Sequence, residues 1–389
     1  MKIALVLADT PAYSETFFNT KIKGLLQQGF RVTLYTRNQS KPFDLCPVIC
    51  APDFSGNTFY KILAALKGMM MLVLHLNVVL KFVKLEKESR RPPATIVKNL
   101  FLNSHFFASK AQWVHFGFST LAIGSENVAA AIGAKMAVSF RGFDINVYPL
   151  KNPGCYSLVW KKVDKVHSIS DYLWQKALTI GLSKEVPKEI ITPAVVLESL
   201  PGIAAELYPS KIVTVARFNW IKGLDNALKA IRKLKLEGLE PEYHIVGGGN
   251  REEEELVKFL AHIFEIEEQV VFHGRCSHDR TLQIVKDAKV YLQPSLNEGF
   301  CNAVLEAQAL GIPCVVTNGG ALPENVLSGK TGWLVPVFDN QKLSDALKTA
   351  LTITGADLQK MRDEGIKMVK TRYAITKQID KFREFYTNK

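Results

Sequence analysis

Short apolar runs that end in loops and lead into helices recur along this chain of 389 residues. Residues 3–7 are typical of a strand buried on both faces, a helix ends near Gly29, and residues 31–36 form the next predicted strand. A second series of the same kind begins with residues 211–216. Strands that alternate with helices indicate parallel sheets covered by helices. The sequence therefore predicts an α/β fold, and its length allows two domains.

The composition is that of a globular protein, with 47% hydrophobic and 22% charged residues, and it excludes a disordered or fibrous chain. The formal net charge of +12 favours an anionic partner: a phosphorylated substrate, a membrane surface or nucleic acid. Nucleic acid ranks last, because no zinc-type cysteine spacing or aromatic-basic motif accompanies the charge. The six scattered cysteines fit a reducing compartment. Met1 leads directly into a strand without a secretory signal, which predicts a cytoplasmic protein.

The stretch 292–313 carries the most chemical information. A strand must end at Pro294, because proline cannot donate to a sheet ladder. A loop follows, and helix formers run from about Asn302 until a glycine and a proline end them. Glu298 is therefore predicted in the loop and Glu306 in the helix. The first turn of a helix binds anions, and two flanking carboxylates can accept bonds from sugar hydroxyls, so the stretch suits a sugar nucleotide.

The arrangement Pro-Ser-x-x-Glu-Gly-Phe-x-x-x-x-x-Glu-Ala-x-Ala-x-Gly-x-Pro resembles the signature of the retaining glycosyltransferases of family four. Either glutamate alone would more often be a solvated surface carboxylate. The resemblance implies a GT-B fold, with two Rossmann-like domains whose parallel sheets face an interdomain cleft. Residues 1–195 would form the acceptor-side domain and residues 196–370 the nucleotide-sugar domain. Residues 371–389 would form a helix that crosses back, and the irregular residues 194–209 are the predicted linker.

Arg217 and Lys222 follow the strand 211–216 and precede Gly223. A planar guanidinium and a mobile ammonium are the two cations that neutralise a diphosphate, and glycine allows a helix terminus to approach it. Outside this context, a loop arginine and lysine would be surface charges. The pattern Val-x-Arg-x-x-x-x-Lys-Gly resembles the diphosphate-binding pair of the family.

A further strand ends at Gly247 and Gly248, where close backbone approach to a nucleotide is possible. The residues that follow do not complete a Gly-x-Gly-x-x-Gly fingerprint, so a nicotinamide dehydrogenase is not supported. In the resemblance, Glu298 would hold the transferred sugar and Glu306 the nucleotide ribose. The implied catalytic residues are Arg217, Lys222 and Glu298, and the implied donor-binding residues are Gly247, Gly248, Gly274, Arg275, Glu298, Gly299, Phe300, Cys301, Asn302 and Glu306.

The acceptor side of the predicted cleft is carried by loops at the ends of strands in the first half. The loop around Ser14 resembles the family's N-terminal loop, although a simple helix-capping box explains its residues equally well. Arg141 stands where the family usually has a histidine that contacts the transferred sugar. We expect an arginine there to pair with a carboxylate or phosphate, or else to shape the loop by pairing with Asp144. The predicted acceptor-side residues are Ser14, Glu15, Thr16, His115, Arg141 and Asp144.

Residues 68–83 form a strongly apolar helix candidate that is too short to span a bilayer. One interpretation is an amphipathic segment on an anionic membrane, and the other is a helix packed in the domain with a solvated basic end. The basic residues around it, which face only Glu86 and Glu88, are Lys61, Lys67, Lys81, Lys84, Lys87, Arg90, Arg91 and Lys98.

The resemblance implies transfer of a sugar, with retention, from a nucleotide-diphosphate donor to a glycan or lipid-linked acceptor in cell-surface polysaccharide biosynthesis. No Asp-x-Asp site is evident, so no metal is expected, and the donor would be a co-substrate rather than a cofactor. The predicted location is the cytoplasm, with a peripheral site on the inner membrane face as an extension. The alternative is a catalytically inactive protein that binds sugar nucleotides. A phosphorylase would require an added phosphate or cofactor site that the sequence does not show.

Overall fold

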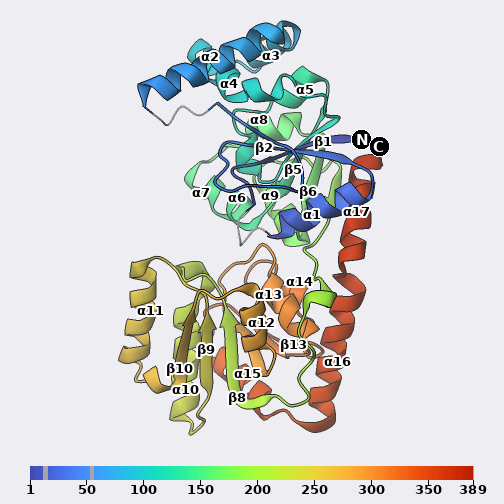
Figure 1. Ribbon diagram of the computed structural model, residues 1–389. Coiled ribbons are helices and arrows are strands. Elements are labelled where there is room, and N and C mark those ends of the chain that lie inside the picture. Colours follow the sequence, from blue (N-terminus) through green and yellow to red (C-terminus); the bar gives the residue numbers. More distant parts are fainter. Residues whose placement is uncertain (12–15, 53–56, 389) are drawn as a thin grey trace. The chain divides into compact units, whose positions relative to one another are not determined.

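The computed structural model of the protein describes residues 1–11, 16–52 and 57–388 (Figure 1). The chain forms two compact units. The first unit comprises Met1–Ile191 together with Ile379–Lys389, and the second comprises Thr192–Gln378. In sequence terms, the second unit is therefore inserted between the main body of the first unit and its last segment. The predicted linker, residues 194–209, falls within the start of the second unit.

A parallel sheet forms the centre of the first unit, and over the described residues its strand order is β3-β2-β1-β4-β5-β6-β7. Every neighbouring pair is parallel. The strands are β1 (Lys2–Leu7), β2 (Arg31–Thr36), β3 (Val48–Cys50), β4 (Trp113–Phe116), β5 (Lys135–Phe140), β6 (Lys165–Ser168) and β7 (Lys188–Ile190). Strands β4 and β6 are buried at every residue, as expected for strands that are covered by helices on both faces.

The helices of the first unit lie between these strands in the chain. They are α1 (Thr16–Gln27), α2 (Thr58–Leu74), α3 (Leu76–Glu88), α4 (Pro93–Asn103), α5 (Val128–Ile132), α6 (Gly142–Asn146), α7 (Tyr148–Lys151), α8 (Ser157–Lys162) and α9 (Asp171–Thr179), with short 3-10 turns η2 (Ser104–Phe106) and η3 (Ser119–Ala122). The last helix of the chain, α17 (Ile375–Thr387), begins in the second unit and ends in the first, where Phe385 is fully buried.

The single apolar helix predicted over residues 68–83 is wrong, because α2 and α3 are separate helices whose axes differ by 98°. The chain bends at His75, whose backbone angles leave the helical region. Helix α3 takes its direction from its buried face. There the Glu86 carboxylate accepts hydrogen bonds from Asn99 Nδ2 at 2.8 Å and Asn127 Nδ2 at 2.7 Å. These partners are distant in sequence, so local periodicity could not reveal the bend.

Within the described part of the chain, no single helix is long and apolar enough to cross a bilayer. Only the bent pair formed by residues 61–74 and 76–88 reaches the required length and composition, and it does so as two helices taken together.

The second unit is built on another parallel sheet, with the described strands in the order β10-β9-β8-β11-β12-β13. The strands are β8 (Tyr208–Val215), β9 (Glu242–Val246), β10 (Val270–Gly274), β11 (Ala288–Gln293), β12 (Cys314–Thr317) and β13 (Gly332–Val335). The helices are α10 (Leu224–Leu236), α11 (Arg251–Ile263), α12 (His278–Val285), α13 (Asn302–Ala309), α14 (Leu322–Asn325), α15 (Asn340–Thr352) and α16 (Gly355–Arg372), with the 3-10 turns η4 (Leu197–Ser199), η5 (Trp220–Lys222) and η6 (Glu267–Gln269).

Helix α10 shows how the sequence specifies the packing of this unit. Leu224, Leu228 and Ile231 recur at helical spacing and are buried against the sheet, together with Ala227 and Leu234. The same core receives Tyr243 from β9 and Leu292 from β11. The apolar stripe thus fixes the position of the loop that precedes α10.

In each sheet the order of the strands reverses at one point. In the second unit the chain adds β9 and β10 on one side of β8, and then adds β11, β12 and β13 on the other side. Strands β8 and β11 are therefore neighbours, and the chain continues from them toward opposite edges of the sheet. Open parallel sheets of this kind bind ligands at the carboxyl ends of the two strands that flank the reversal. The loops after Val215 and Gln293 are therefore the candidate ligand-binding loops of this unit.

Candidate active site

The loop after β8 and the loop after β11 touch each other at the edge of the second sheet. The backbone N–H of Leu296 donates to Ile221 O at 2.8 Å. Gly223 has φ 63°, and a Cβ at this position would lie 2.2 Å from Pro294 O. Only glycine permits this approach, which brings the start of α10 against the loop after β11.

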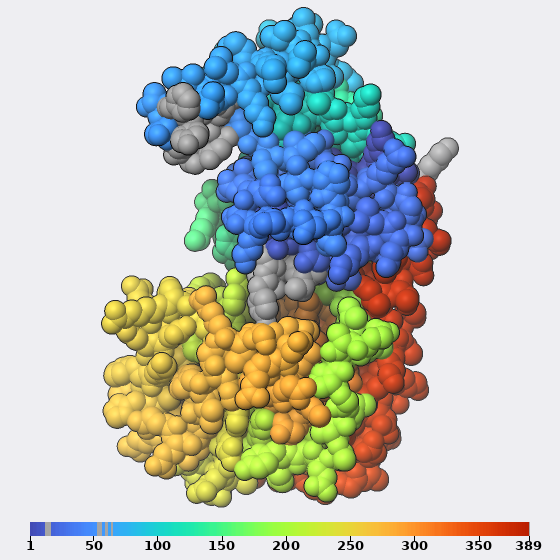
Figure 2. Space-filling model, viewed as in Figure 1, coloured from blue at the N-terminus to red at the C-terminus, as the bar shows by residue number. Residues whose placement is uncertain are grey.

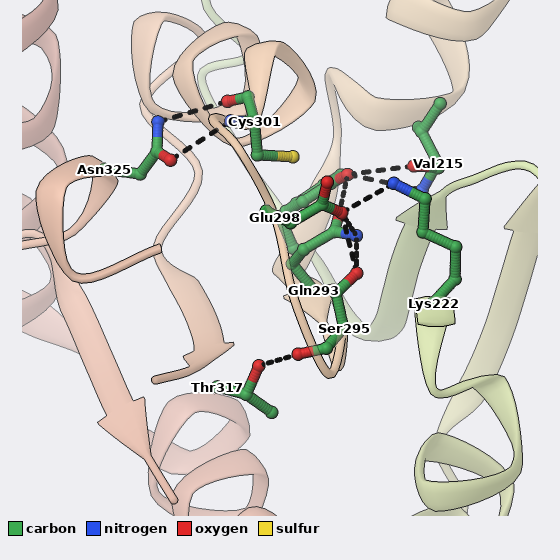
Figure 3. A network of polar contacts seen from close by, with 9 residues as sticks. Val215, Lys222, Gln293, Ser295, Glu298, Cys301, Thr317 and Asn325 are labelled. Atoms are coloured by element: carbon green, nitrogen blue, oxygen red, sulfur yellow. Dashed lines mark hydrogen bonds and ion pairs between the residues drawn. The ribbon is translucent and has the colours of Figure 1, made fainter. Parts of the chain in front are cut away.

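This contact brings Lys222 and Glu298 together, although 76 residues separate them (Figure 3). Lys222 Nζ donates to Glu298 Oε1 at 2.6 Å. The same oxygen accepts from Ser295 Oγ at 2.8 Å and from Gln293 Nε2 at 3.3 Å. Gln293 is oriented in turn by Tyr291, whose hydroxyl donates to Gln293 Oε1 at 2.8 Å. The two residues predicted to hold the diphosphate and the sugar are thus members of one hydrogen-bond network.

The Glu298 side chain is about nine-tenths buried, with 10% of its surface exposed, and the Lys222 side chain retains 16%. A buried carboxylate without a partner would cost several kcal/mol, and here the Lys222 ammonium and the two neutral donors supply its partners. All three bonds converge on Oε1. The Oε2 atom receives none of them and is the oxygen through which Glu298 can accept a bond from a ligand.

The backbone of the Glu298 loop is held by the segment that follows β12. Glu298 N donates to Gly319 O at 3.3 Å, and Ala321 N donates to Glu298 O at 2.8 Å. Gly320 has φ 66°, and a Cβ there would lie 2.3 Å from Glu298 O. The Thr317 hydroxyl also donates to Ser295 O. The loop is therefore fixed on both sides, which sets the direction of the carboxylate before any ligand binds.

Helix α13 begins directly after this loop, as the sequence predicts. Asn325 clamps the residue before it: Oδ1 accepts from Cys301 N at 3.2 Å, and Nδ2 donates to Cys301 O at 3.2 Å. Burial raises the pKa of the Cys301 thiol to about 12, so it is a packing group rather than a nucleophile. Among the described residues, no side chain caps α13. The backbone N–H groups of Ala303 and Val304 contact the Cys301 thiol, so an anion at this helix start would meet the N–H of Asn302 and the positive end of the helix dipole.

Glu306 lies on α13 as predicted, but its partner was not foreseen. His278 Nε2 and Glu306 Oε1 are 3.0 Å apart, and the bond raises the pKa of His278 above its ordinary value of 6.5. His278 is the first residue of α12, 28 residues earlier in the chain. Only the sheet order brings the two helices together, so no local pattern in the sequence could have indicated this pair.

Gly247, directly after β9, packs against protein backbone. Gly247 has φ 131°, and a Cβ there would lie 1.9 Å from Ala216 O. Gly247 N donates to Gly274 O at 2.8 Å. Arg275 Nη2 donates to Gly249 O at 2.7 Å. Close backbone approach explains Gly247, where the approaching group is Ala216 O in the loop after β8. The nucleotide contact expected for Gly247 and Gly248 stays a prediction. Of the remaining predicted donor residues, Gly248 lies in the loop after β9, and Gly299 and Phe300 lie in the loop between β11 and α13.

On the predicted acceptor side, Ser14 and Glu15 lie outside the described residues, and α1 begins at Thr16. The Arg141 guanidinium carbon lies 3.8 Å from the ring centre of Phe17. Asp144 is fully buried, and its two oxygens accept from Arg141 N and Ser119 N at 2.8 Å each. Burial raises the pKa of Asp144 to about 7. Asp144, predicted among the acceptor-side residues, thus closes the loop at the start of α6 with its carboxylate.

His115 also requires a correction. It was predicted on the acceptor side near the cleft, but its ring is fully buried in the first unit. His115 Nε2 lies 2.8 Å from Ser139 Oγ, and His115 Nδ1 lies 2.5 Å from Tyr386 Oη. Both ring nitrogens thus have partners within the unit, so the histidine supports the fold and is not available to a substrate.

The first unit contains a cavity of about 250 Å³. It is lined by Lys67, Ser104 and His105 together with apolar residues of β3 and α2, and it includes none of the predicted acceptor-side residues. Among residues 1–11, 16–52 and 57–388, no three His, Cys, Asp or Glu side chains are arranged to hold a metal ion.

Solved structures define the class to which this architecture belongs. Sucrose-phosphate synthase from Thermosynechococcus elongatus superposes with a TM-score of 0.75 at 16% identity, over 99% of this chain and 98% of that one. Anabaena HepE in complex with UDP and glucose gives a TM-score of 0.74 at 13% identity, over 100% of both chains. The two units therefore have the GT-B glycosyltransferase fold, as predicted.

Residues 203–368 match the protein family described as glycosyl transferases group 1, so the second unit of this chain contains a domain of that family. The putative colanic acid biosynthesis glycosyltransferase WcaL of Escherichia coli is 31% identical over 243 residues, which cover 60% of this chain and 59% of that protein. The amylovoran biosynthesis glycosyltransferase AmsK of Erwinia amylovora is 28% identical over 63% of this chain and 62% of its own length. The matched region thus spans about three-fifths of each relative.

Proposed function

We propose that the protein is a glycosyltransferase that moves a sugar from a nucleoside-diphosphate donor to a glycan or lipid-linked acceptor in the synthesis of a cell-surface polysaccharide. The observation that carries this proposal is the Lys222–Glu298 network at the ligand-binding edge of the second sheet. It places a cation, a buried carboxylate and an uncapped helix start within one pair of loops. The names of WcaL and AmsK support the polysaccharide context.

The donor would be held by three groups with distinct chemistry. Lys222, the exposed Arg217 and the start of α13 would balance the charge of the diphosphate. Glu306, oriented by His278, would accept hydrogen bonds from the ribose hydroxyls. Glu298 Oε2 would accept from a hydroxyl of the transferred sugar, while Oε1 stays bonded to its protein donors.

The reaction would break the bond between the sugar C1 atom and the diphosphate oxygen, and the electron pair would leave with the diphosphate. The acceptor hydroxyl would form the new bond to C1 on the same face, and its proton would pass to the departing phosphate oxygen. The protein contribution is then positional and electrostatic. Because Arg217, Lys222 and the helix start supply the positive charge that the leaving group needs, we propose transfer without a metal ion.

Incubation with a panel of nucleoside-diphosphate sugars tests this proposal by thermal unfolding and by product analysis. A matching donor should raise the unfolding temperature, because it binds only the folded protein. It should also transfer its sugar to a glycan or lipid-linked acceptor with the anomeric configuration retained. Stabilisation without transfer to any acceptor would instead indicate the inactive sugar-nucleotide-binding protein. No stabilisation by any donor would exclude both the glycosyltransferase and the inactive binding protein.

We propose that the enzyme acts in the cytoplasm, at the inner face of the membrane that carries such acceptors.

A further inference from the structure

Helices α2 and α3 expose an unusual amount of apolar surface. Nine large side chains of these helices and their junction are each between 46% and 70% exposed: Ile62, Leu63, Leu66, Met69, Met70, Val73, Leu74, Leu76 and Leu80. We call this set the α2–α3 surface. The two helices form the outer layer of the first unit, beyond α4 and α5, and appear as light-blue atoms in Figure 2. Contiguous apolar patches of this extent mark interaction sites in soluble proteins.

The opposite face of the two helices is attached to the unit, so the exposed set is not a sign of a detached segment. A Cβ on Gly68 would lie 3.0 Å from the Phe101 ring of α4. On α3, Val79 and Phe82 are buried, and the Phe82 ring packs 5.4 Å from that of Phe107. The protein thus fills the inner face and leaves the outer face for a partner.

Neither helix alone is long and apolar enough to span a bilayer, and the bent pair suits a position in the plane of the interface. Helix α2 has 17 residues and α3 has 13, and the chain turns by 98° between them. Crossing the hydrocarbon core takes about 20 residues in one helix. A bent pair with one apolar face can instead lie flat, with that face in the boundary between headgroups and acyl chains.

The charges around the apolar surface have one sign. Six cations are exposed there: Lys61, Lys67, Lys81, Lys84, Lys87 and Arg90. Arg91 is not one of them, because it pairs with the buried Glu86 at 3.5 Å and with Glu126 at 2.7 Å. Among the described side chains of residues 58–90, Glu88 is the only exposed acid. A second copy of the same surface would bring cation against cation, so a symmetric dimer is disfavoured.

We propose that the α2–α3 surface docks the protein onto an anionic lipid bilayer, with its apolar side chains inserted at the interface and its lysines over the acidic headgroups. This inference stands independently of the proposed transfer reaction, because it concerns physical association alone.

Sedimentation of the full chain with vesicles tests the proposal. We compare phosphatidylcholine vesicles with vesicles that contain phosphatidylglycerol in addition. The wild type should bind the anionic vesicles and should be released as salt rises, since exposed charges are screened. The Leu66→Asp/Val73→Asp variant should bind roughly tenfold more weakly or not at all, because it places two charges in the inserted face. The Lys81→Ala/Lys84→Ala/Lys87→Ala variant should lose its preference for anionic vesicles.

Matched controls use the second unit. The Leu256→Asp/Phe259→Asp variant alters two exposed apolar residues of α11, and the triple alanine variant at Lys229, Lys342 and Lys367 removes three exposed lysines. Both should bind vesicles like the wild type. Equal binding of the wild type to neutral and anionic vesicles, or equal losses in the controls, would overturn the proposal. So would a wild-type dimer in solution that the Leu66→Asp/Val73→Asp variant abolishes, since the surface would then contact a second copy.

Discussion

The hydroxyl of Tyr386 lies 2.5 Å from Nδ1 of His115, although 271 residues separate them. This contact is the first in a series of hydrogen bonds whose donors and acceptors can be assigned. The Ile191 carbonyl only accepts, so His167 Nε2 donates to it at 3.0 Å and His167 Nδ1 accepts from Ser139 Oγ at 2.8 Å. Ser139 then accepts from His115 Nε2, which leaves His115 Nδ1 to accept from Tyr386. This assignment takes both imidazoles as neutral, because burial holds their pKa values well below 6.5.

We expect this arrangement to make the protein less stable in mild acid. Burial, reinforced by the nearby Lys21 charge, holds the pKa values of His115 and His167 well below 6.5, and burial lowers that of His105 to about 3. Below pH 6.5 the unfolded chain takes up protons at these positions and the folded chain does not, so stability falls as pH falls. Each group contributes about 1.4 kcal/mol per pH unit.

Asp144 opposes this trend, because its raised pKa of about 7 means that the folded state keeps a proton that the unfolded state loses above pH 3.8. One carboxyl offsets one of the three histidines between about pH 4 and 6.5. Urea unfolding at pH 7.5 and pH 5.5 measures the net effect, which should be a lower free energy of unfolding at pH 5.5. A free energy that is unchanged or higher at pH 5.5 would contradict this reading of the cluster.

Removal of the Tyr386 hydroxyl should weaken the same cluster. In Tyr386→Phe the ring remains, but His115 Nδ1 loses its closest donor in a buried site, at a cost of about 1–3 kcal/mol. Tyr208→Phe is the matched control, since the Tyr208 hydroxyl bonds to Glu242 at an exposed position. Chemical unfolding at pH 7.5 compares the two variants. An equal decrease in the free energy of unfolding of the two variants would show that the buried hydrogen bond stabilises the protein no more than the exposed one.

Lys222→Ala and Arg217→Ala should each lower kcat by a factor on the order of 10²–10³, because each removes a charge that we propose to stabilise the departing diphosphate. Lys222→Ala also leaves Glu298 without its ammonium partner. Lys229→Ala, which breaks an exposed pair with Asp225, is the lysine control and should keep wild-type kcat. Wild-type turnover in both Lys222→Ala and Arg217→Ala would remove them from the mechanism.

Glu306→Gln should weaken donor binding by roughly 10- to 100-fold, the equivalent of about 1.5–3 kcal/mol for hydrogen bonds to a charged group. Calorimetry with the most stabilising nucleoside diphosphate measures this, and Glu255→Gln on the exposed face of α11 is the control. His278→Gln should have a smaller effect but should abolish any change in donor affinity as pH rises through the raised pKa of His278. If the pH dependence persists in His278→Gln, the histidine does not position Glu306.

Arg141 should contact an anionic group, either a uronic-acid carboxylate on the donor or a phosphate on the acceptor. Its guanidinium is stacked near Phe17, which orients its planar donors, and lysine cannot reproduce a bidentate contact. We therefore expect Arg141→Ala to lose more kcat/KM with acidic than with neutral substrates, and Arg141→Lys not to restore it. If the loss is small and equal for all substrates and lysine restores it, the residue only shapes the loop.

The most accurate sequence predictions concern elements whose ends are marked by a proline or glycine nearby in the sequence. Pro294 and the glycine and proline after α13 fix the strand–loop–helix around Glu298, and the structure has those boundaries to within two residues. The Lys222–Glu298 pair was expected only as two ligands of one donor. Its direct bond depends on Gly223 packing against Pro294, which no pattern within either loop specifies.

The failures share a physical cause, because each depends on contacts between distant segments. After the bend at His75, the buried Glu86 holds α3 through partners distant in sequence, and the buried His115 contacts Tyr386 at the far end of the chain. Short polar motifs at strand ends were interpreted as ligand contacts. The structure shows that some of them, including Asp144, satisfy backbone donors instead.

The order of the two units along the chain has an evolutionary consequence. The second unit is a continuous insert, Thr192–Gln378, whereas the first is assembled from both sides of it. Recombination at only two junctions could therefore replace the whole insert with that of a relative and leave the first sheet intact, although the second junction falls within α17, whose first residues would come from the relative. Chimaeras exchanged at these junctions would show whether the second unit determines which sugar donor is used.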